Sequence, residues 1–560
     1  MLTVGLLTRA EYASVPASPQ WVLVGGLSST GASFRLRYDS TTSANVVLTV
    51  EQASDGQTVF SHQSTDSTGL EQVTVDGLIP QTEYIYTLSG DSESESATRG
   101  TFTTPASEGT QFDFSIVAAS CSWTGSTSSI YTEAASAPTT SGNKPLLVLH
   151  GGDFHYEDIS STSLSQRITA IDTVLHSSSQ QTLFNSMAMA YMWDDHDWLG
   201  NDSDGYNHGL QARSVALQSY HEAFPYYQPL PASVNVTSNE EEEYVSPYYA
   251  FTIGTVRFIL TDLMSESTAE RMFSEEQRDW FFGELANATA YDYVVWLSTK
   301  PWIGEEDPGD DSWMGHYEER AQISDWIQYY IGNVNNGGKQ NLIVVSGDAH
   351  MVAFDDGSHT YYGNNTAQNI KSFPILQTGP WDRMGSVKGG PYSHGCTTVL
   401  HQRNHQYSVI DFIFEDQQSC IQINSYSDGY RAIFAKKICG SLFHPIASYA
   451  SEEDTAANKT CDAPPSFTTN TYIALGVSLG LILVVIALLF CYFPCGEAFW
   501  LLGIVIFFYV LSAVLGWAIT TLMGVKQFDT FVISLILAIQ MGIATVFVVF
   551  CCMSKTTRKK

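Results

Sequence analysis

The first hundred residues alternate apolar and polar side chains in short runs. The runs SFRLRY, NVVLTV, QVTV, YIYTL and GTFTT lie between residues 20 and 104, and glycine and serine separate them. A period of two turns one face of each strand toward a core, and short strands at close spacing are typical of a β-sandwich. We therefore expect a small β-sandwich over residues 18–106.

From residue 110 onward, apolar runs alternate with amphipathic segments. The runs FDFSIVAAS, PLLVLH, MAMAYM, YDYVVWLST and NLIVVSG predict buried strands, and SLSQRITAIDTVLHSSSQQTLF, HGLQARSVALQSYHEAF and YEERAQISDWIQYYI predict helices. The segment YYAFTIGTVRFILTD predicts a hairpin that turns near Gly254, and YSVIDFIFE with SCIQINSYS returns to strands. This order predicts an α/β domain over residues 110–445.

The last eighth of the chain has a different character. Three apolar runs without a charged residue are each long enough to cross a bilayer as a helix, namely Tyr472 to Phe493, Ala498 to Leu522 and Phe531 to Met553. Residues 446–471 form the expected linker, and residues 554–560, SKTTRKK, form a basic tail that should stay in the cytoplasm. An odd number of spans predicts a multi-pass membrane protein with the rest of the chain extracellular or lumenal, at the plasma membrane.

Cysteines and glycosylation sequons agree with that topology. Five sequons precede the first span, and we expect glycans at four of them: Asn235, Asn287, Asn364 and Asn458. Two disulfides in an oxidising compartment are expected among Cys396, Cys420, Cys439 and Cys461. One feature disagrees, because the N-terminus MLTVGLLTRAEYASV has too short an apolar core for a secretory signal.

The net charge of the chain excludes one class of partner. The sequence has 58 acidic and 26 basic residues, a formal charge of -32. Nucleic-acid binding needs a basic face to neutralise phosphates, so we expect no nucleic-acid partner.

Polar side chains follow the predicted strands of the α/β domain. Cys121 ends FSIVAASC, GGDFHYED carries Asp153 and Tyr156, and WDDHD carries Asp195 and His196. Lys300 follows YVVWLST, and SGDAH carries Asp348 and His350.

Strand ends converge on a ligand crevice in α/β sheets. Each motif alone also fits a turn or an inert core thiol. Adjacent carboxylates beside an apolar strand, however, require a compensating cation or proton, so together the motifs predict a metal centre.

The residue types indicate a mixed centre. Carboxylates suit hard cations, whereas a thiolate prefers a transition metal, and the Tyr156 phenol would favour ferric iron. Two cations a few ångströms apart can hold a phosphoryl group and activate water.

In this order and spacing, GDFHYED, WDDHD…ND, KPW and SGDAH resemble the PhoD-like alkaline phosphatase family of metallophosphoesterases, within the calcineurin-like superfamily. The resemblance covers roughly residues 21–440, and LIPQTEYIYTL resembles the corner of a fibronectin type III domain. It implies a four-layer αββα metallophosphoesterase sandwich preceded by a fibronectin III-like β-sandwich.

The resemblance also implies roles for individual residues. It implies Fe(III) held by Cys121, Asp153, Tyr156 and His350, and Ca(II) held by Asp153, Asp195, Asn201 and Asp348. His196 would be the catalytic imidazole, while Asp194 and Asp197 would cap the loop or orient His196. Substrate contacts would come from Lys300, Arg257 and Arg320, although Arg320 more simply pairs with acids on its own helix. Asn201 also heads a sequon, and a glycan there would exclude it from a metal cleft.

We therefore expect a membrane-anchored extracellular phosphoesterase, an alkaline phosphatase or phosphodiesterase that hydrolyses phosphate esters with a metal-activated hydroxide. One alternative is a conventional dinuclear Zn, Mn or Fe metallophosphoesterase that acts on membrane lipids or glycolipids. The other is a non-catalytic cell-surface receptor on a decayed phosphatase fold.

Overall fold

A computed structural model describes residues 19–38, 46–64, 68–90, 97–205, 208–225, 227, 246–365, 370–400, 402–415 and 418–446. The chain divides into two compact units, and every element below belongs to the unit Met1–Thr398 with Asn404–Asp462.

Several sequence predictions fall on residues outside this described part. The basic tail, Cys461 and the sequons at Asn235 and Asn458 lie there, as do the three predicted spans, Tyr472 to Phe493, Ala498 to Leu522 and Phe531 to Met553. Within the described part of the chain, no helix has both the length and the apolar character needed to cross a membrane. The membrane-spanning helices therefore have no support in the structure and stay a prediction from the sequence.

The first seven strands form two antiparallel sheets, as their alternation predicted. One sheet has the order β1 (Pro19–Ser28), β2 (Gly31–Tyr38), β5 (Leu70–Asp76). The other has the order β4 (Thr58–Gln63), β3 (Val47–Gln52), β6 (Glu83–Ser89), β7 (Thr98–Thr103). Phe34 of the first sheet meets Phe102 of the second edge to face, with ring centroids 5.5 Å apart. The predicted corner is present, because the Ile79 N–H donates to Tyr84 Oη at 2.8 Å.

Two larger sheets follow. The six-stranded sheet has the order β10 (Ala188–Met192), β9 (Leu147–Gly151), β8 (Phe114–Ala119), β19 (Gln406–Glu415), β20 (Gln418–Ser427), β21 (Arg431–Cys439). The seven-stranded sheet has the order β11 (Tyr249–Ile253), β12 (Val256–Leu260), β13 (Tyr293–Ser298), β14 (Leu342–Ser346), β17 (Ile375–Gln377), β15 (Val352–Asp355), β18 (Cys396–Thr397). A small separate sheet pairs β16 (Lys371–Ser372) with β22 (His444–Pro445). The predicted hairpin is β11–β12, turning at Gly254 with φ 57°.

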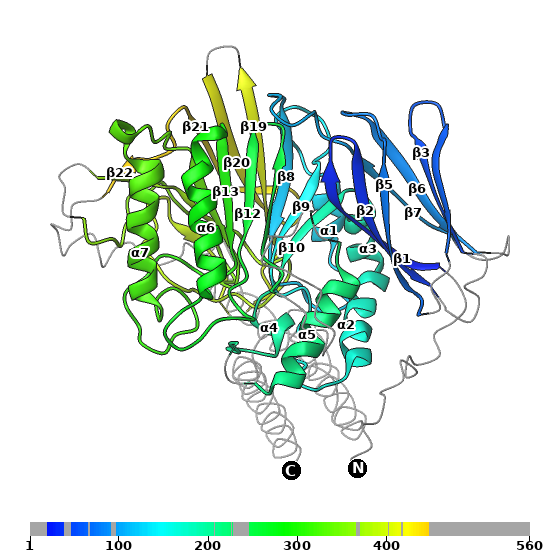
Figure 1. The fold of residues 1–560 in the computed structure, drawn as a ribbon, viewed down its shortest axis with the longest axis horizontal. Coiled ribbons are helices and arrows are strands. Elements are labelled where there is room, and N and C mark those ends of the chain that lie inside the picture. Colours follow the sequence, from blue (N-terminus) through cyan, green and yellow to red (C-terminus); the bar gives the residue numbers. More distant parts are fainter. Residues whose placement is uncertain are drawn as a thin grey trace, which may run out of the picture. The chain divides into compact units, whose positions relative to one another are not determined.

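Helices lie on the outer faces of these two sheets, which gives a mixed α/β architecture (Figure 1). The helices are α1 (Ser129–Ala135), α2 (Leu164–His176), α3 (Ser178–Phe184), α4 (Asp195–Trp198), α5 (Leu210–Ala223), α6 (Glu275–Asn287) and α7 (Tyr317–Ile327). The single helix predicted for SLSQRITAIDTVLHSSSQQTLF is wrong. Ser177 is extended there (φ -65°, ψ 125°) and its hydroxyl donates to the Ser126 carbonyl, so α2 ends and α3 begins.

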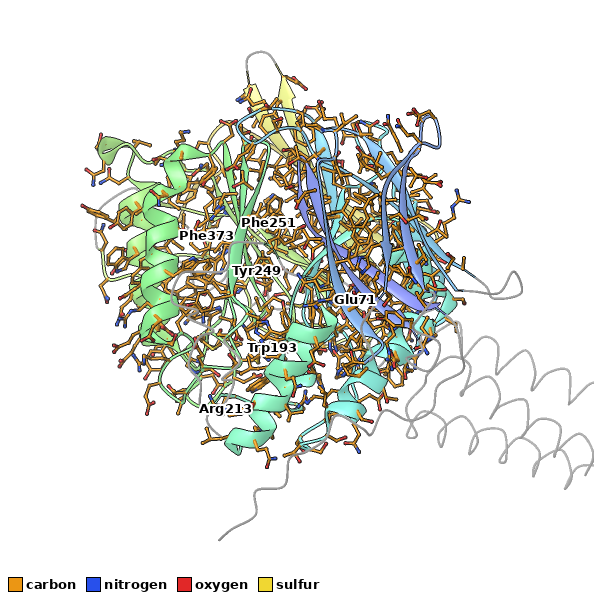
Figure 2. All side chains as sticks on the ribbon, turned by 45° about the vertical axis from the view of Figure 1, so that its right-hand side comes forward. Glu71, Trp193, Arg213, Tyr249, Phe251 and Phe373 are labelled. Carbon is orange, nitrogen blue, oxygen red and sulfur yellow. A yellow bond between two sulfur atoms is a disulfide. The ribbon has the colours of Figure 1, made fainter. Side chains whose placement is uncertain are left out.

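Apolar side chains fill the space between the two large sheets (Figure 2). Phe412 of β19 lies 6.1 Å from Phe258 of β12 and 6.0 Å from Tyr293 of β13, measured between ring centroids. Strands β8, β9, β10, β13 and β14 are buried along their whole length. Fully buried strands of this kind suit parallel pairing, and β8–β9–β10 and β12–β13–β14 are parallel. Their carboxyl ends therefore reach one end of the core.

The small sandwich is anchored to the six-stranded side of the core. Trp21 Nε1 donates to Asp172 Oδ1 of α2 at 2.7 Å, and the Arg37 guanidinium donates to both Asp172 oxygens at 3.2 Å. Gly25 of β1 approaches β10 so closely that an added Cβ would lie 2.7 Å from the Met189 carbonyl oxygen. Asp172 is thus shared by two strands of the sandwich.

Cys420 and Cys439 form a disulfide between the neighbouring strands β20 and β21. Cys396 is disulfide-bonded as well. Both observations agree with the expectation that the late cysteines are oxidised. Cys121 is a free, buried thiol.

We expect Asp172→Ala to destabilise the protein by about 2–3 kcal/mol, because it leaves a buried indole N–H and a guanidinium without their acceptor. The midpoint of urea unfolding measures this loss. Asp76→Ala, which removes an exposed carboxylate from the same sandwich, is the control and should shift the midpoint little. Equal midpoints for the two variants would contradict an anchoring role for Asp172.

Candidate metal centre

Five strands are each followed by a polar residue two positions after the last residue of the strand. Cys121, Asp153 and Asp194 stand two residues after β8, β9 and β10. Lys300 and Asp348 stand two residues after β13 and β14. The first three strands belong to the six-stranded sheet and the last two to the seven-stranded sheet. The centre therefore lies where the carboxyl edges of the two sheets meet.

The backbone at these positions is unusual. Cys121, Asp153 and Asp348 have φ of 57°, 56° and 62°, in the left-handed region that L-residues rarely adopt. The Cys121 N–H donates to the Gly152 carbonyl at 3.0 Å, and the Ser122 N–H donates to the Asp153 carbonyl at 2.8 Å, so the two loops hold each other. Strained backbone of this kind concentrates at functional sites. Here the left-handed backbone directs the side chains of three candidate ligands toward the centre.

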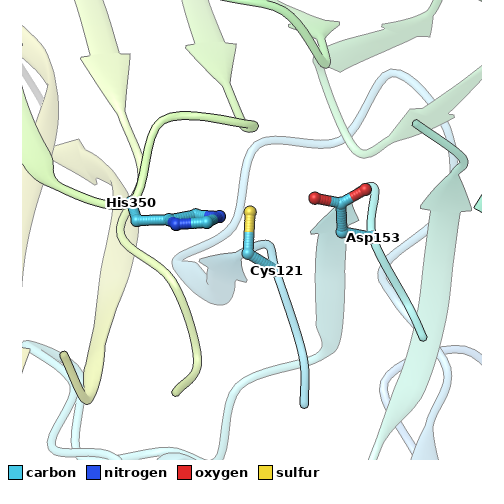
Figure 3. A group of neighbouring side chains, drawn as sticks. All are labelled: Cys121, Asp153 and His350. Atoms are coloured by element: carbon cyan, nitrogen blue, oxygen red, sulfur yellow. The ribbon is translucent and has the colours of Figure 1, made fainter. Parts of the chain in front are cut away.

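Cys121, Asp153 and His350 form the first cluster (Figure 3). Their ligand atoms all lie within 4.8 Å of one another. Tyr156 joins them, because its hydroxyl donates to Asp153 Oδ2 at 2.6 Å and lies 3.0 Å from His350 Nε2. The four predicted iron ligands are therefore together.

His350 is held in the orientation that a metal ligand needs. Its Nδ1 lies 2.6 Å from the Met384 carbonyl oxygen, to which it can only donate. Nε2 then carries the lone pair and faces the Tyr156 hydroxyl. A ligating histidine usually donates its other ring N–H to such a carbonyl.

The first cluster contains a buried thiol and a buried carboxyl whose ionised forms are disfavoured. Burial, with the carboxylates of Asp153 and Asp348, raises the pKa of the Cys121 thiol well above its usual range. Burial raises the pKa of Asp153 to about 7, although His196 lowers it. Asp153 Oδ1 is buried without a hydrogen-bond partner. A thiol and a carboxyl placed this way are stabilised as anions only by a cation.

These residues fit a transition-metal ion. Two ligands at right angles and about 2.0–2.1 Å from one ion lie about 2.9 Å apart. The contacts of Tyr156 with Asp153 and His350, 2.6 and 3.0 Å, are close to that separation. Thiolate and imidazole ligands together suit a transition-metal ion better than calcium or magnesium.

The second cluster contains carboxylates that are already paired. Ligand oxygens of Asp194, Asp195 and Asp348 gather within 4.8 Å, as do those of Asp195, Asp202 and Asp311. Burial would raise the pKa of Asp195, but Lys300 and His196 hold it below its usual value. Burial likewise opposes ionisation of Asp348, whose pKa is held low by Lys300 and Lys388. Lysine ammonium groups thus supply the positive charge here.

His196 borders both clusters. Its Nδ1 lies 2.5 Å from an Asp158 carboxylate oxygen, and its ring centroid lies 4.0 Å from that of Tyr156. A ligand atom of its imidazole lies within 4.8 Å of those of Asp153 and Asp195. Asp194 and Asp197 form a capping box on α4, which is the capping role predicted for them. The orienting partner of His196 is Asp158.

Three further predicted site residues have contacts or exposure that the sequence did not show. Arg257, near the start of β12, pairs with Glu284 at 2.8 Å. The Arg320 guanidinium donates to the carbonyls of Trp302 and Gly304 at 3.0 Å, so it braces the loop after β13. Asn201 is exposed, and it is the neighbouring Asp202 N–H that donates to Asp195 Oδ2 at 2.7 Å.

Four residues of the centre were not predicted from the sequence. Asp158, Asp202, Asp311 and Lys388 lie in loops, farther along the chain from the preceding strand than the strand-end residues do. Asp158 follows the predicted Tyr156 by two residues, and Asp202 ends the WDDHD…ND motif, so the signal for both was proximity to a motif. Nothing in the local sequence marks Asp311 or Lys388, which only the fold brings to Lys300 and Asp348.

Comparison with known proteins supports this architecture. No protein-family model matches the chain, and no curated protein matches it by sequence. A solved structure of PhoD is similar over 76% of this chain and 93% of its own, with a TM-score of 0.52 and 16% identity. Identity at this level shows the fold alone, and the chain has a PhoD-like fold.

Two further solved structures are similar to a small part of the chain. One is a computationally redesigned β-sandwich protein, 21% identical, covering 16% of this chain and 94% of its own with a TM-score of 0.14. The other is the sensor domain of the anti-sigma factor RsgI4 of Pseudobacteroides cellulosolvens, 18% identical, covering 17% and 97% with a TM-score of 0.14.

Cys121→Ala should lower the affinity of the protein for iron by about tenfold or more, because it removes the one soft ligand of the first cluster. Elemental analysis after dialysis against a chelator measures the retained iron. Cys121→Ser keeps a small polar group and should lose iron as well. Wild-type retention in both variants would contradict a thiolate ligand.

Tyr156→Phe should remove the phenolate-to-iron charge-transfer band from the visible spectrum of the iron-loaded protein, because phenylalanine has no oxygen to bind ferric iron. The absorption spectrum is compared with that of Tyr329→Phe, which alters a tyrosine that is 60% exposed on the surface. An unchanged spectrum in Tyr156→Phe would exclude Tyr156 as a ligand.

Proposed function

We propose that the protein is a metal-dependent phosphoesterase, a PhoD-like alkaline phosphatase or phosphodiesterase, acting outside the cytoplasm and tethered by the predicted spans. The observation that carries this proposal is the convergence of a thiol, a carboxyl, a phenol and an imidazole beside His196. A binding-only receptor has no need for a buried Asp153 with an unpartnered carboxylate oxygen in a strained loop.

A ferric ion bound by Cys121, Asp153, Tyr156 and His350 would supply Lewis-acid polarisation of a phosphate oxygen and activation of water. The protein's own residues hold the substrate and move the proton. Lys388 is 32% exposed at its side chain while its Nζ contacts Asp348, so it lies at the rim of the centre. The Arg383 guanidinium lies 3.4 Å from the Tyr156 ring centroid. These two cations are suited to attract an anionic phosphate ester, which the net negative charge of the whole chain would otherwise repel.

His196 is suited to protonating the leaving oxygen. The bond to Asp158 fixes Nδ1, so Nε2 is the nitrogen that remains for the substrate. Burial lowers the pKa of His196, but the carboxylates of Asp153, Asp195 and Asp158 outweigh it and raise the pKa above its usual value. A raised pKa keeps the imidazole protonated to a higher pH, which favours an acid role.

Oxidised cysteines support the extracytoplasmic part of the proposal. The Cys420–Cys439 disulfide is typical of proteins in oxidising compartments. The sequon residues Asn287 and Asn364 are both exposed, as glycan attachment requires. Protease protection and glycosidase sensitivity of the full chain in membranes test this topology directly.

Hydrolysis of bis(p-nitrophenyl) phosphate by the purified, iron-loaded full chain tests the enzymatic proposal. Turnover that is lost with a chelator and restored with iron is the expected result. Tight metal binding without hydrolysis of monoesters or diesters would contradict it and favour a non-catalytic receptor. Faster turnover of a phospholipid or glycolipid phosphate than of soluble esters would favour the lipid-directed alternative.

His196→Ala should lower kcat for an alkyl phosphodiester by about 10²–10⁴-fold, because an alkoxide cannot leave without a proton. The loss should be much smaller for a p-nitrophenyl ester, whose leaving group needs no proton, and the iron content should not change. His62→Ala removes a histidine paired to Glu71 in the sandwich at 2.9 Å, and it serves as the matched control. An equal loss for both leaving groups would contradict the acid role.

A further inference from the structure

Lys300 places a buried ammonium at the middle of the second cluster. Its side chain is 0% exposed. The ammonium nitrogen lies 2.6 Å from an oxygen of Asp311 and 3.4 Å from one of Asp195. It also lies 3.5 Å from Asp194 and 3.6 Å from Asp348. These four carboxylates come from the ends of β10 and β14 and from a loop after β13, so the nitrogen is surrounded from several sides.

A divalent cation would need the same space. Calcium binds carboxylate oxygens at about 2.3–2.6 Å, which would place it among the oxygens that surround the Lys300 nitrogen. Lys300 reaches them from the strand end on which β13 positions it, and its neighbour Thr299 also contacts Asp194 Oδ1 at 3.3 Å. An ammonium and a divalent ion repel each other and compete for the same lone pairs.

Lys388 engages the same cluster from the other side. Its Nζ lies 2.7 Å from each oxygen of Asp348. Two carboxylates that the family resemblance assigns to calcium, Asp195 and Asp348, are thus paired with lysines. Of the other two residues in that set of four, Asn201 is exposed and Asp153 belongs to the first cluster. This donor set does not fit a second divalent cation.

The first cluster is the opposite case. Among the described residues, Asp153 forms no ion pair with a lysine or arginine; its Oδ1 has no hydrogen-bond partner, as is also true of Asp194 Oδ2 in the second cluster. The strand-end geometry is the same for both clusters, yet lysines form ion pairs with carboxylates of the second cluster, whereas His196 and Arg383 lie beside the first. The difference lies in which residue type β13 delivers.

We propose that the Lys300 ammonium takes the place of the second metal ion, so that the centre holds a single transition-metal ion faced by a permanent positive charge. This inference rests on the proposed function for the existence of the first ion. It changes the expected cofactor from iron plus calcium to iron alone.

The first test counts metals in the wild-type full chain, purified in detergent and dialysed against buffer with Ca²⁺ and then without it. Elemental analysis should give about one transition-metal ion for each chain and no retained calcium. One transition metal together with one calcium would overturn the inference and leave the phosphoesterase proposal standing. No retained metal at all would instead contradict the phosphoesterase proposal.

The second test removes the ammonium. Lys300→Met keeps the length of the side chain and frees the carboxylates, so Ca²⁺ affinity measured by equilibrium dialysis should rise about tenfold or more over wild type. Its melting temperature should also rise with added Ca²⁺ more than that of wild type. Lys339→Met, which removes an exposed lysine, is the matched control and should gain neither effect.

Lys388→Met separates the two lysines. It frees Asp348 but leaves the Lys300 ammonium in the cluster, so it should gain far less calcium affinity than Lys300→Met. Unaltered calcium binding in Lys300→Met would overturn the inference. If that variant folds neither with nor without Ca²⁺, the metal count of the wild-type chain decides.

Discussion

Carboxylates buried where the two large sheets meet must be compensated by positive charge, and the organisation of the centre follows from this requirement. Asp153, Asp194, Asp195 and Asp348 are all nearly inaccessible to solvent. Ionised groups in such places are strongly disfavoured unless a cation or well-placed donors offset the loss of hydration. The chain meets the requirement in two ways: with lysines on one side, and on the other with a set of ligands that suits a metal ion.

The fold makes this concentration of charge possible. Parallel strands direct their carboxyl ends to one edge, and stacking two such sheets brings two edges together. Each functional residue stands two positions after the end of its strand, so the side chains lie at the same height above the sheets. Left-handed backbone at Cys121, Asp153 and Asp348 then turns the polypeptide sharply after each strand. The packed strands hold these three residues in that strained conformation. The hydrophobic core thus stabilises a centre that its own polar groups would destabilise.

Sequence reasoning reached the strand-end residues because hydrophobic runs of five or six residues locate strand ends closely. Cys121, Asp153 and Asp348 are each next to such a run, and Tyr156 and His350 follow within three residues. Asp311 and Lys388 are far from any strand end, and their position depends on how long loops fold back over the sheets. Lys300 was noticed but given a substrate contact, because a sequence shows that a lysine is present and not that four carboxylates surround it. Arg257 and Arg320 were chosen by residue type alone, and the structure gives partners that the sequence could not show, Glu284 for Arg257 and the Trp302 carbonyl for Arg320.

A fixed ammonium and a bound divalent ion are not equivalent in such a centre. The ammonium carries one charge instead of two and cannot expand its coordination to accept a phosphate oxygen directly. It does, however, remain in place whatever the concentration of calcium, and its position is set by β13 and not by binding equilibrium. Burial raises the pKa of Asp194 well above its usual value in spite of the neighbouring Lys300. The single charge of the ammonium therefore does not fully offset the loss of hydration of this carboxylate. A centre built as we propose would depend on a single exchangeable ion, and Lys388 at its rim would supply part of the attraction for substrate that a second metal would otherwise provide.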